Sequence, residues 1–208
     1  KGQEIPMHDP RVKSGVGLQY ALAVNGADHW FAQHDPFFTS VDSPGVKAAS
    51  MLGLSEPVEA LDLSCKKVRH VLYTSFLNSA YDLLGVCVFG FIARSVTPLD
   101  KLLNAVEAVT GWETSWWEIL KAGERALAMA KTYNARQGLT IANDSLPEKF
   151  FKPFNGGPQD GKPGLDPEAF KEAIQAFYEM AGWEAETGKP KAAKLYELGL
   201  DWLVDKKN

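Results

Sequence analysis

Helical spacing of apolar residues is the feature that most limits the folds open to this sequence. Val68, Leu72, Phe76 and Ala80 recur every four residues, which places them on one face of a helix over residues 66–80. Similar patterns, bounded by capping residues and glycines, predict further helices at 15–25, 97–110, 114–135, 166–181 and 190–198. No segment keeps the period-two alternation of a half-buried strand for long. The sequence therefore predicts an all-α, irregular multi-helix fold with no sheet of three or more strands.

Capping residues predict more closely where two of these helices begin. Thr97 is expected to cap a helix that has Pro98 at its first position, and Thr114 or Ser115 is expected to cap the next one. In that longer helix, Trp117, Leu120, Leu127 and Ala130 form the predicted inner face, while Lys121, Glu124, Arg125 and Lys131 form the predicted outer face.

Two stretches break the helical pattern. Residues 143–164 are rich in Pro and Gly and predict a loop that is long for a compact domain. The apolar stretch 82–92 has no charge after Asp82 and contains Gly85 and Gly90. Both glycines weaken a regular helix and leave room for a close approach to the backbone.

Composition excludes several classes of protein. The net charge is −4 and the 22 Lys and Arg residues are scattered, so no basic stripe for nucleic acid is present. The longest apolar run, 83–93, is about half of the ~20 residues that cross a membrane. Cys65 and Cys87 cannot form a disulfide framework, which fits a cytoplasmic protein. The chain opens without Met or an apolar signal segment, so we expect a piece of a longer, non-exported protein.

Three residues are candidates for chemistry. His29 follows Gly26-Ala27-Asp28, and its imidazole could act as an acid, a base or a ligand, or simply pack at a helix end. Asp82 could accept hydrogen bonds from an amino-substituted heterocycle, or cap a turn. Cys87 could be a thiolate ligand of an iron–sulfur cluster, or fill the core as a small apolar residue. From these residues alone the alternatives stay open.

Short motifs recur along the chain in a fixed order. In sequence letters they are GQEIPMHDPR (2–11) with GVGLQYA (15–21), GADH (26–29), DLLGVC (82–87), YNARQG (133–138), DSLPEKF (144–150), and the group YEMAGW, TGKP and LGL (178–200). In this order they resemble the C-terminal region of the tungsten-dependent aldehyde:ferredoxin oxidoreductase family. The resemblance covers almost the whole chain.

The resemblance implies a fold, cofactors and residue roles. Residues 1–208 would be the C-terminal α-helical domain of a larger oxidoreductase, without its N-terminal pterin-binding and cysteine-rich middle regions. Asp82 would hydrogen-bond a pterin of a tungsten (or molybdenum) bis-pyranopterin, with Gly85 in the same cofactor-binding motif. Cys87 would be the fourth cysteine of a 4Fe-4S cluster, and His29 would approach the metal centre as a proton-transfer or oxyanion-polarising group.

The resemblance also implies partners and an activity. These are the remaining domains of the same enzyme, ferredoxin as electron acceptor, and a small aldehyde that is oxidised to a carboxylic acid. The enzyme could be a homo-oligomer. One cluster thiolate is insufficient, so the 208-residue chain alone should hold neither cluster nor pterin stably.

Departures from the family pattern concern the substrate more than the cofactor. Asp28 stands where a Cys or another small residue is common, Gln137 stands where Glu is common, and residues 141–143 replace a basic–acidic pair. Two alternatives therefore remain. One is an aromatic-thioester (benzoyl-CoA type) reductase subunit of the same family, and the other is a non-catalytic helical interaction module.

Overall fold

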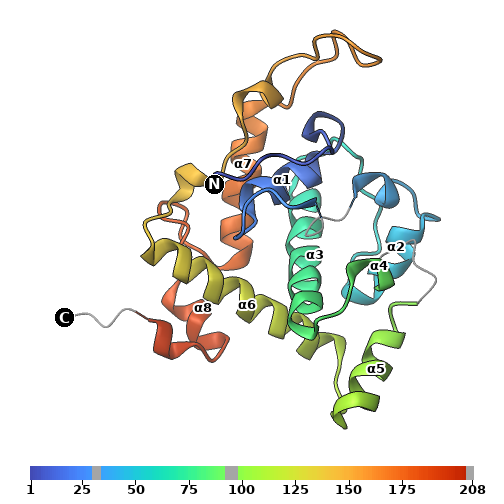
Figure 1. Cartoon of the computed structure of the whole chain (residues 1–208), viewed down its shortest axis with the longest axis vertical. Helices are drawn as coiled ribbons and strands as arrows, with labels where there is room; N and C mark the ends of the chain where they lie inside the picture. The colour runs from blue at the N-terminus through green and yellow to red at the C-terminus, as the bar shows by residue number, and fades with distance from the viewer. Residues whose placement is uncertain (30–33, 92–97, 205–208) are drawn as a thin grey trace.

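The computed structural model describes residues 1–29, 34–91 and 98–204, and these ranges form helices and loops (Figure 1). The α-helices are α1 (Ser14–Leu22), α2 (Pro44–Ala49), α3 (Cys65–Leu84), α4 (Val88–Phe91), α5 (Lys101–Thr110), α6 (Trp116–Arg136), α7 (Pro167–Ala181) and α8 (Ala192–Glu197). The β-type contact within these ranges is one isolated antiparallel bridge, Trp183 to Pro190. The predicted all-α fold is confirmed. None of the described helices has the length and apolar character to cross a membrane.

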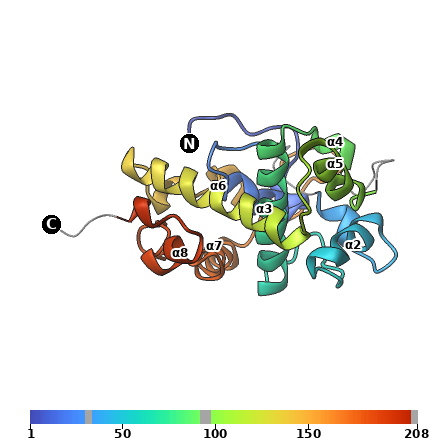
Figure 2. The same cartoon turned by 90° about the horizontal axis from the view of Figure 1, so that it is seen from below.

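Helix α3 forms the centre of the molecule. Helix α6 crosses it and α7 packs against it, as the two views in Figure 1 and Figure 2 show. The crossing of α3 and α6 is close, because a Cβ on Gly123 would lie 2.0 Å from the carbonyl oxygen of Phe76. Helix α1 packs on α3 and α7, and all nine of its residues are buried. The short helix predicted at 15–25 is therefore confirmed, with its end at Leu22.

Helix α3 is longer than its apolar pattern predicts. It begins after Ser64, whose hydroxyl accepts a hydrogen bond from the Lys66 amide, and it ends at Leu84. Gly85 follows with φ +65°, a left-handed conformation that ends helices and that glycine adopts without strain. Asp82 thus lies in the last turn of α3 rather than after it. Gly90 lies within α4, a helix of only four residues, so the stretch 82–92 is interrupted at Gly85 and holds a single short helical turn among its described residues.

The two predicted helix starts differ in outcome. Helix α5 begins at Lys101, so Pro98 is not its first residue, and Thr97 lies outside the described residues. Helix α6 begins with a complete capping box. The Ser115 hydroxyl accepts from the Glu118 amide, and the Glu118 carboxylate accepts from the Ser115 amide. Ser115, rather than Thr114, is therefore the cap.

The faces of α6 are partly reversed with respect to the prediction. Trp117 is 69% exposed, although the pattern places it inside. Glu124 and Lys131 are buried, although the pattern places them outside. Glu124 accepts hydrogen bonds from Lys121 (2.6 Å) and Lys194 (2.8 Å), and these ion pairs make its burial tolerable.

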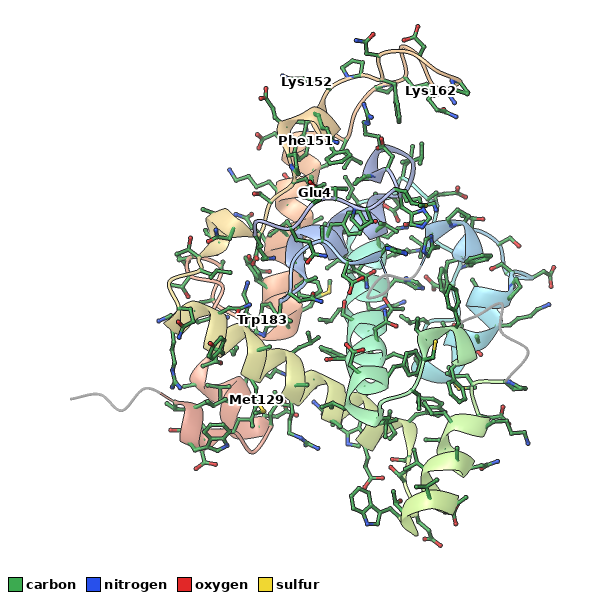
Figure 3. All side chains as sticks on the ribbon, viewed as in Figure 1. Glu4, Met129, Phe151, Lys152, Lys162 and Trp183 are labelled. Carbon is green, nitrogen blue, oxygen red and sulfur yellow. The ribbon has the colours of Figure 1, made fainter. Side chains whose placement is uncertain are left out.

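A buried carboxylate joins α6, α7 and the N-terminal segment. Asp144 forms ion pairs with Lys131 of α6 and with Lys1 (2.8 Å for the latter), and it accepts a hydrogen bond from the Tyr178 hydroxyl of α7. The Lys131 ammonium also lies 5.3 Å from the centre of the Trp183 ring, which is labelled in Figure 3. Asp144 lies at the start of the predicted loop 143–164, which contains the 3-10 turn Glu148–Phe151.

Candidate functional site

A cavity of about 430 Å³ lies at the C-terminal end of α3. Its lining combines carboxylates, an amide, a thiol and apolar side chains: Asp28, Asn78, Tyr81, Asp82, Val86, Cys87, Val88 and Phe89. Most of these residues come from the last two turns of α3 and the segment after it, whereas Asp28 comes from the loop after α1. The cavity therefore collects chemistry-bearing residues from two distant parts of the sequence.

The turn after α3 brings Asp82 and Cys87 to the same cavity. The helix stops at Leu84, and the amide of Gly85 donates to the Asp82 carbonyl oxygen at 3.1 Å. No other atom lies within 4 Å of a Cβ built on Gly85, so the close approach expected there has no partner within the described chain. Both the Asp82 and the Cys87 side chains are exposed. The alternative interpretation of Cys87 as a core residue is therefore wrong.

Negative charge is disfavoured at Asp82 for several reasons. Partial burial, and then the nearby carboxylate of Asp28, raise the pKa of Asp82 above its usual value. Asp82 also lies in the last turn of α3, where the helix dipole is negative. The Asn25 amide donates a hydrogen bond to an Asp28 carboxylate oxygen at a long 3.4 Å.

His29 lies in a separate group of titratable side chains. Its ring centre is 5.3 Å from that of His8, edge to face, and His8 lies 4.3 Å from His34. Lys13 Nζ is 3.3 Å from His8 Nδ1 and 3.1 Å from His34 Nδ1. Because an ammonium group only donates, both Nδ1 atoms are acceptors and each neutral ring carries its proton on Nε2. Asp28 links this histidine cluster to the cavity, since it precedes His29 directly.

A buried ion pair holds the histidine cluster together. Asp35 follows His34 and accepts hydrogen bonds from the amides of Gly15 (3.0 Å) and Val16 (3.1 Å), at the start of α1. It also forms a buried ion pair with Lys67 of α3. The carboxylate thereby fixes the segment that carries His34 against the start of α1, next to Lys13. A Cβ on Gly15 would lie 2.6 Å from Asp35 Oδ1, so the contact requires glycine.

Sequence reasoning missed several residues of both groups. It treated Asp28 as a departure from the motif, and it assigned no role to His8 or His34. One signal was available, since three of the four histidines lie between residues 8 and 34. Their proximity, however, depends on Asp35 and Lys67, whose pairing no local pattern reveals.

The thiols limit which metal groups the chain can hold. Cys65 is the first residue of the 20-residue helix α3, which is about 28 Å long, and Cys87 lies three residues beyond the other end of that helix. They cannot bind the same cluster. In the described part of the chain, no three or more His, Cys, Asp and Glu side chains are arranged as a metal site. An exposed Cys87 therefore fits a cluster only if other parts of a larger protein supply the remaining thiolates.

Comparison with known proteins assigns the chain first to a class, the oxidoreductases. A family model described as aldehyde ferredoxin oxidoreductase, domains 2 and 3, matches residues 1–200. The chain belongs to the aldehyde ferredoxin oxidoreductase family.

Individual relatives agree with this assignment. The chain is 32% identical over 203 residues to a tungsten-containing aldehyde ferredoxin oxidoreductase of Pyrococcus horikoshii, and 30% identical over 202 residues to that of Pyrococcus furiosus. These matches cover 97% and 96% of this chain but 30% of each relative. The chain thus spans under a third of the length of these enzymes.

A solved structure shares the fold. The active-site complex of benzoyl coenzyme A reductase with 1,5-dienoyl-CoA superposes with a TM-score of 0.65, over 97% of this chain and 32% of that chain. The sequence identity is 17%, so this likeness concerns the fold alone.

Proposed function

We propose that residues 1–208 are the C-terminal helical part of a larger aldehyde oxidoreductase. The enzyme oxidises an aldehyde and water to a carboxylic acid, releasing two protons and two electrons, with ferredoxin as the acceptor. The family match and the printed names of the relatives support this proposal. The observation that carries it is the cavity where Asp82 and Cys87 lie exposed on either side of the turn at Gly85.

The cavity residues fit the edge of a cofactor that other domains complete. Asp82 would accept hydrogen bonds from the amino and ring N–H groups of a pterin, and Gly85 leaves its backbone open to the same group. Cys87 would supply one thiolate to a 4Fe-4S cluster, while the other three come from outside this chain. When bound, the tungsten (or molybdenum) bis-pyranopterin and the cluster supply the redox chemistry.

His29 would move a proton during aldehyde oxidation. One ring nitrogen takes a proton that the reaction releases, and the contact with His8 holds the imidazole in place. Replacing His29 by Ala in the full-length enzyme should slow turnover by about 10²–10⁴-fold. Tungsten, molybdenum and iron contents should stay at the wild-type level, because His29 is not proposed as a ligand. Activity that falls only in proportion to metal content would make His29 a structural residue.

Metal analysis of the full-length protein separates this function from its alternatives. We expect tungsten or molybdenum together with iron, and turnover of an aldehyde with ferredoxin. A protein that reduces an aromatic thioester and leaves aldehydes unchanged is a benzoyl-CoA type reductase. We test this alternative because the chain shares its fold with a benzoyl coenzyme A reductase complex. A full-length protein without metal and pterin is a helical interaction module, which contradicts the proposal.

The two cysteines offer a matched pair of variants. Cys87→Ser in the full-length enzyme should lose or damage the cluster, because serine oxygen is a poor ligand for iron–sulfur iron. Cys65→Ser changes an exposed thiol at the opposite end of α3 and should leave iron content and the cluster signal unchanged. Equal iron contents in both variants would remove Cys87 from the ligand set.

Further properties belong to the same proposal. The other domains of the enzyme and ferredoxin are the proposed protein partners, and the compartment is the cytoplasm, where free thiols persist. A homo-oligomer is compatible with the exposed apolar side chains Trp112, Trp117 and Val109 near the α5–α6 junction. Analytical ultracentrifugation of the full-length protein tests the oligomeric state.

A further inference from the structure

A groove of about 730 Å³ follows one face of α6, and its lining is mostly apolar. Helix α6 supplies most of the lining residues, while the loop after α1 and the end of α3 supply the others. Leu83, Met129 and Tyr133 are large apolar or aromatic side chains that line the groove and are exposed in the described part of the chain. Such a continuous apolar surface is typical of a binding surface.

The apolar residues of α6 in this groove have the spacing by which helices pair. Ala122, Ala126, Met129 and Tyr133 are four, three and four residues apart, as in the seam between two packed helices. The two alanines leave room for a second backbone, and the flexible Met129 side chain adapts to the shape of a partner. Together with Leu83 from α3, this face matches the apolar side of an amphipathic helix.

The groove is formed before any partner binds. The side-chain amide of Asn134 donates a hydrogen bond to the carbonyl oxygen of Val24 at 2.7 Å, which holds the loop after α1 against α6. Glu124 and Lys131, on the opposite side of α6, form ion pairs with Lys194 of α8 and with Asp144. Figure 2 shows α7 and α8 along one side of α6 and the N-terminus on the other side. A partner helix can therefore dock without rearranging the groove.

The position of Lys1 indicates which part of the enzyme lies near the groove. The Lys1 ammonium donates hydrogen bonds to the carbonyl oxygens of Ala21 and Ala23, the latter at 2.8 Å, and Ala23 directly precedes Val24 of the groove. The chain spans under a third of the length of its tungsten-containing relatives, and the matching family model describes domains 2 and 3. In such an enzyme, the polypeptide that precedes residue 1 leaves this part of the molecule beside the groove.

The cavity at the end of α3 points to the same region. Leu83 lines the groove, whereas its neighbour Asp82 lines the cavity together with Cys87. In the proposed function, three thiolates from outside this chain join Cys87 at one cluster. The region that supplies them must therefore lie against the end of α3, next to the groove.

We propose that the groove on α6 docks an amphipathic helix from the part of the same polypeptide that precedes residue 1. This inference rests on the proposed function, since it takes the chain to be part of a larger enzyme. Docking covers Leu83, Met129 and Tyr133, and it holds the preceding part of the enzyme within reach of Cys87.

Photo-cross-linking in the full-length protein identifies what covers the groove. The photoreactive residue p-benzoyl-phenylalanine replaces Tyr133, which is 64% exposed in the described chain. In a matched control it replaces Tyr196 of α8, which is 61% exposed and lies outside the groove. Mass spectrometry then maps the peptide joined to each position, and denaturing gels separate links within one chain from links between chains.

We expect position 133 to join a peptide of the same chain that precedes residue 1, with a much lower yield from position 196. A link to a second copy, to another protein or to a peptide after residue 208 overturns the proposed occupant. Equal yields from the two positions would mean that exposure, rather than the groove, decides the link, and no link from position 133 would mean that the groove stays open to solvent. Either result contradicts the proposal.

Ala126→Glu tests whether the docking is apolar. Glutamate forms helices well, so α6 should fold, but an unpaired carboxylate in the groove disfavours docking. Limited proteolysis of the full-length protein before residue 1 should become roughly tenfold faster, because cleavage follows the population of the open form. Ala193→Glu, at an exposed position of α8, is the control and should leave the rate unchanged. Equal rates in both variants contradict apolar docking, and the cross-link decides the matter if Ala126→Glu does not fold.

Neither measurement depends on turnover or cofactor content, so docking and the proposed function can fail separately. A link from position 133 to a peptide before residue 1, in a full-length protein without metal and pterin, supports docking and contradicts the proposed function. A metal-replete enzyme that gives no link from position 133 keeps the proposed function and overturns docking.

Discussion

At the junction of α6 and α7 the carboxylate of Asp144 is surrounded by donors, whereas at the end of α3 the carboxylates of Asp28 and Asp82 face one cavity together. Asp144 is fully buried and holds two lysines and the Tyr178 hydroxyl. At the cavity, the Asn25 amide donates a long hydrogen bond of 3.4 Å to Asp28, and the Asp28 carboxylate adds to the effect of partial burial in raising the pKa of Asp82. The first arrangement stabilises the fold, whereas the second places the exposed carboxylate of Asp82 at a cavity, where a ligand can reach it.

Asp35 belongs to the donor-surrounded kind. It joins the start of α1 to α3 through two backbone amides and Lys67, and both members of its ion pair are 2% exposed. The comparison therefore separates carboxylates that serve packing from those that serve a site. Changing a partner of the first kind should cost stability, and changing a member of the second kind should cost ligand retention.

The largest effect is expected at the buried ion pair. Lys67→Met leaves the Asp35 carboxylate buried with only its two backbone donors, and loss of one partner of a buried pair costs about 3–5 kcal/mol. Hydrogen exchange of the α1 and α3 amides in the full-length protein measures this cost locally. Because Asp35 holds His34 beside Lys13, exchange in that segment should rise as well.

Lys47→Met is the matched control for Lys67→Met. Lys47 forms an exposed ion pair with Asp42, and such pairs contribute about 0–1 kcal/mol. Similar exchange rates in both variants would mean that the buried Asp35 pair does not organise α1. Asp35 would then not be a carboxylate that stabilises the packing of the fold.

The second prediction concerns the stability of the folded protein at acidic pH. His70 of α3 is buried against Phe38, and burial, followed by the charges of Lys67 and Arg69, lowers its pKa to about 4. The unfolded chain binds this proton near pH 6.5, so the contribution of His70 is complete above pH 6.5 and is lost as pH falls towards 4. The expected loss is up to about 3 kcal/mol.

Urea unfolding at pH 7.5 and pH 4.5 tests this effect. His70→Phe keeps an aromatic ring in contact with Phe38 and cannot be protonated, so its stability should fall less between the two pH values than that of the wild type. An equal fall in both proteins would assign the acid sensitivity to the paired carboxylates instead.

Local patterns predict the helices well because capping and periodicity are local. Asp166 accepts hydrogen bonds from the amides of Glu168 and Ala169, and α7 starts and ends as its sequence predicts. The burial of Lys131 could not be predicted, since its partner Asp144 is separated in sequence and Tyr178 lies on another helix. The inner face of α6 is thus decided by tertiary contacts.

The distinction between local and long-range contacts also explains which residues of the candidate site could be predicted from the sequence. Asp82 and Cys87 lie five residues apart, so one turn at Gly85 is enough to bring them to one cavity, and the sequence motif predicts their association. Asp28 joins them from more than 50 residues earlier. The group of His8, Lys13 and His34 depends on the buried Asp35 pair, which has no sequence signature of its own.

A smaller effect is expected at the hydroxyl that donates to Asp144. Tyr178→Phe removes one donor and leaves the two lysines, so the free energy of unfolding should fall by about 1–2 kcal/mol. Denaturant unfolding measures it. Tyr196→Phe is the control, because Tyr196 is 61% exposed and should change stability very little. A loss as large as for Lys67→Met would mean that the Tyr178 hydroxyl contributes more than the two lysines to the stability of buried Asp144.

The smallest effect on stability, and the one of opposite sign, is expected at Asp82. Asp82→Asn removes a charge that Asp28 and the end of the α3 dipole both disfavour, so the cofactor-free protein should gain no more than about 0.5 kcal/mol. The same substitution at Asp144 should cost about 3 kcal/mol, because it leaves Lys131 buried beside a neutral amide. Urea unfolding of both variants at pH 7.5, with pterin retention measured in parallel, compares identical chemistry at the two regions. Asp82→Asn should lose pterin faster while unfolding no more easily, since an amide oxygen still accepts a hydrogen bond but without charge assistance. If Asp82→Asn instead unfolds as readily as Asp144→Asn, the carboxylate at the end of α3 serves the fold, and its role in holding a ligand is lost.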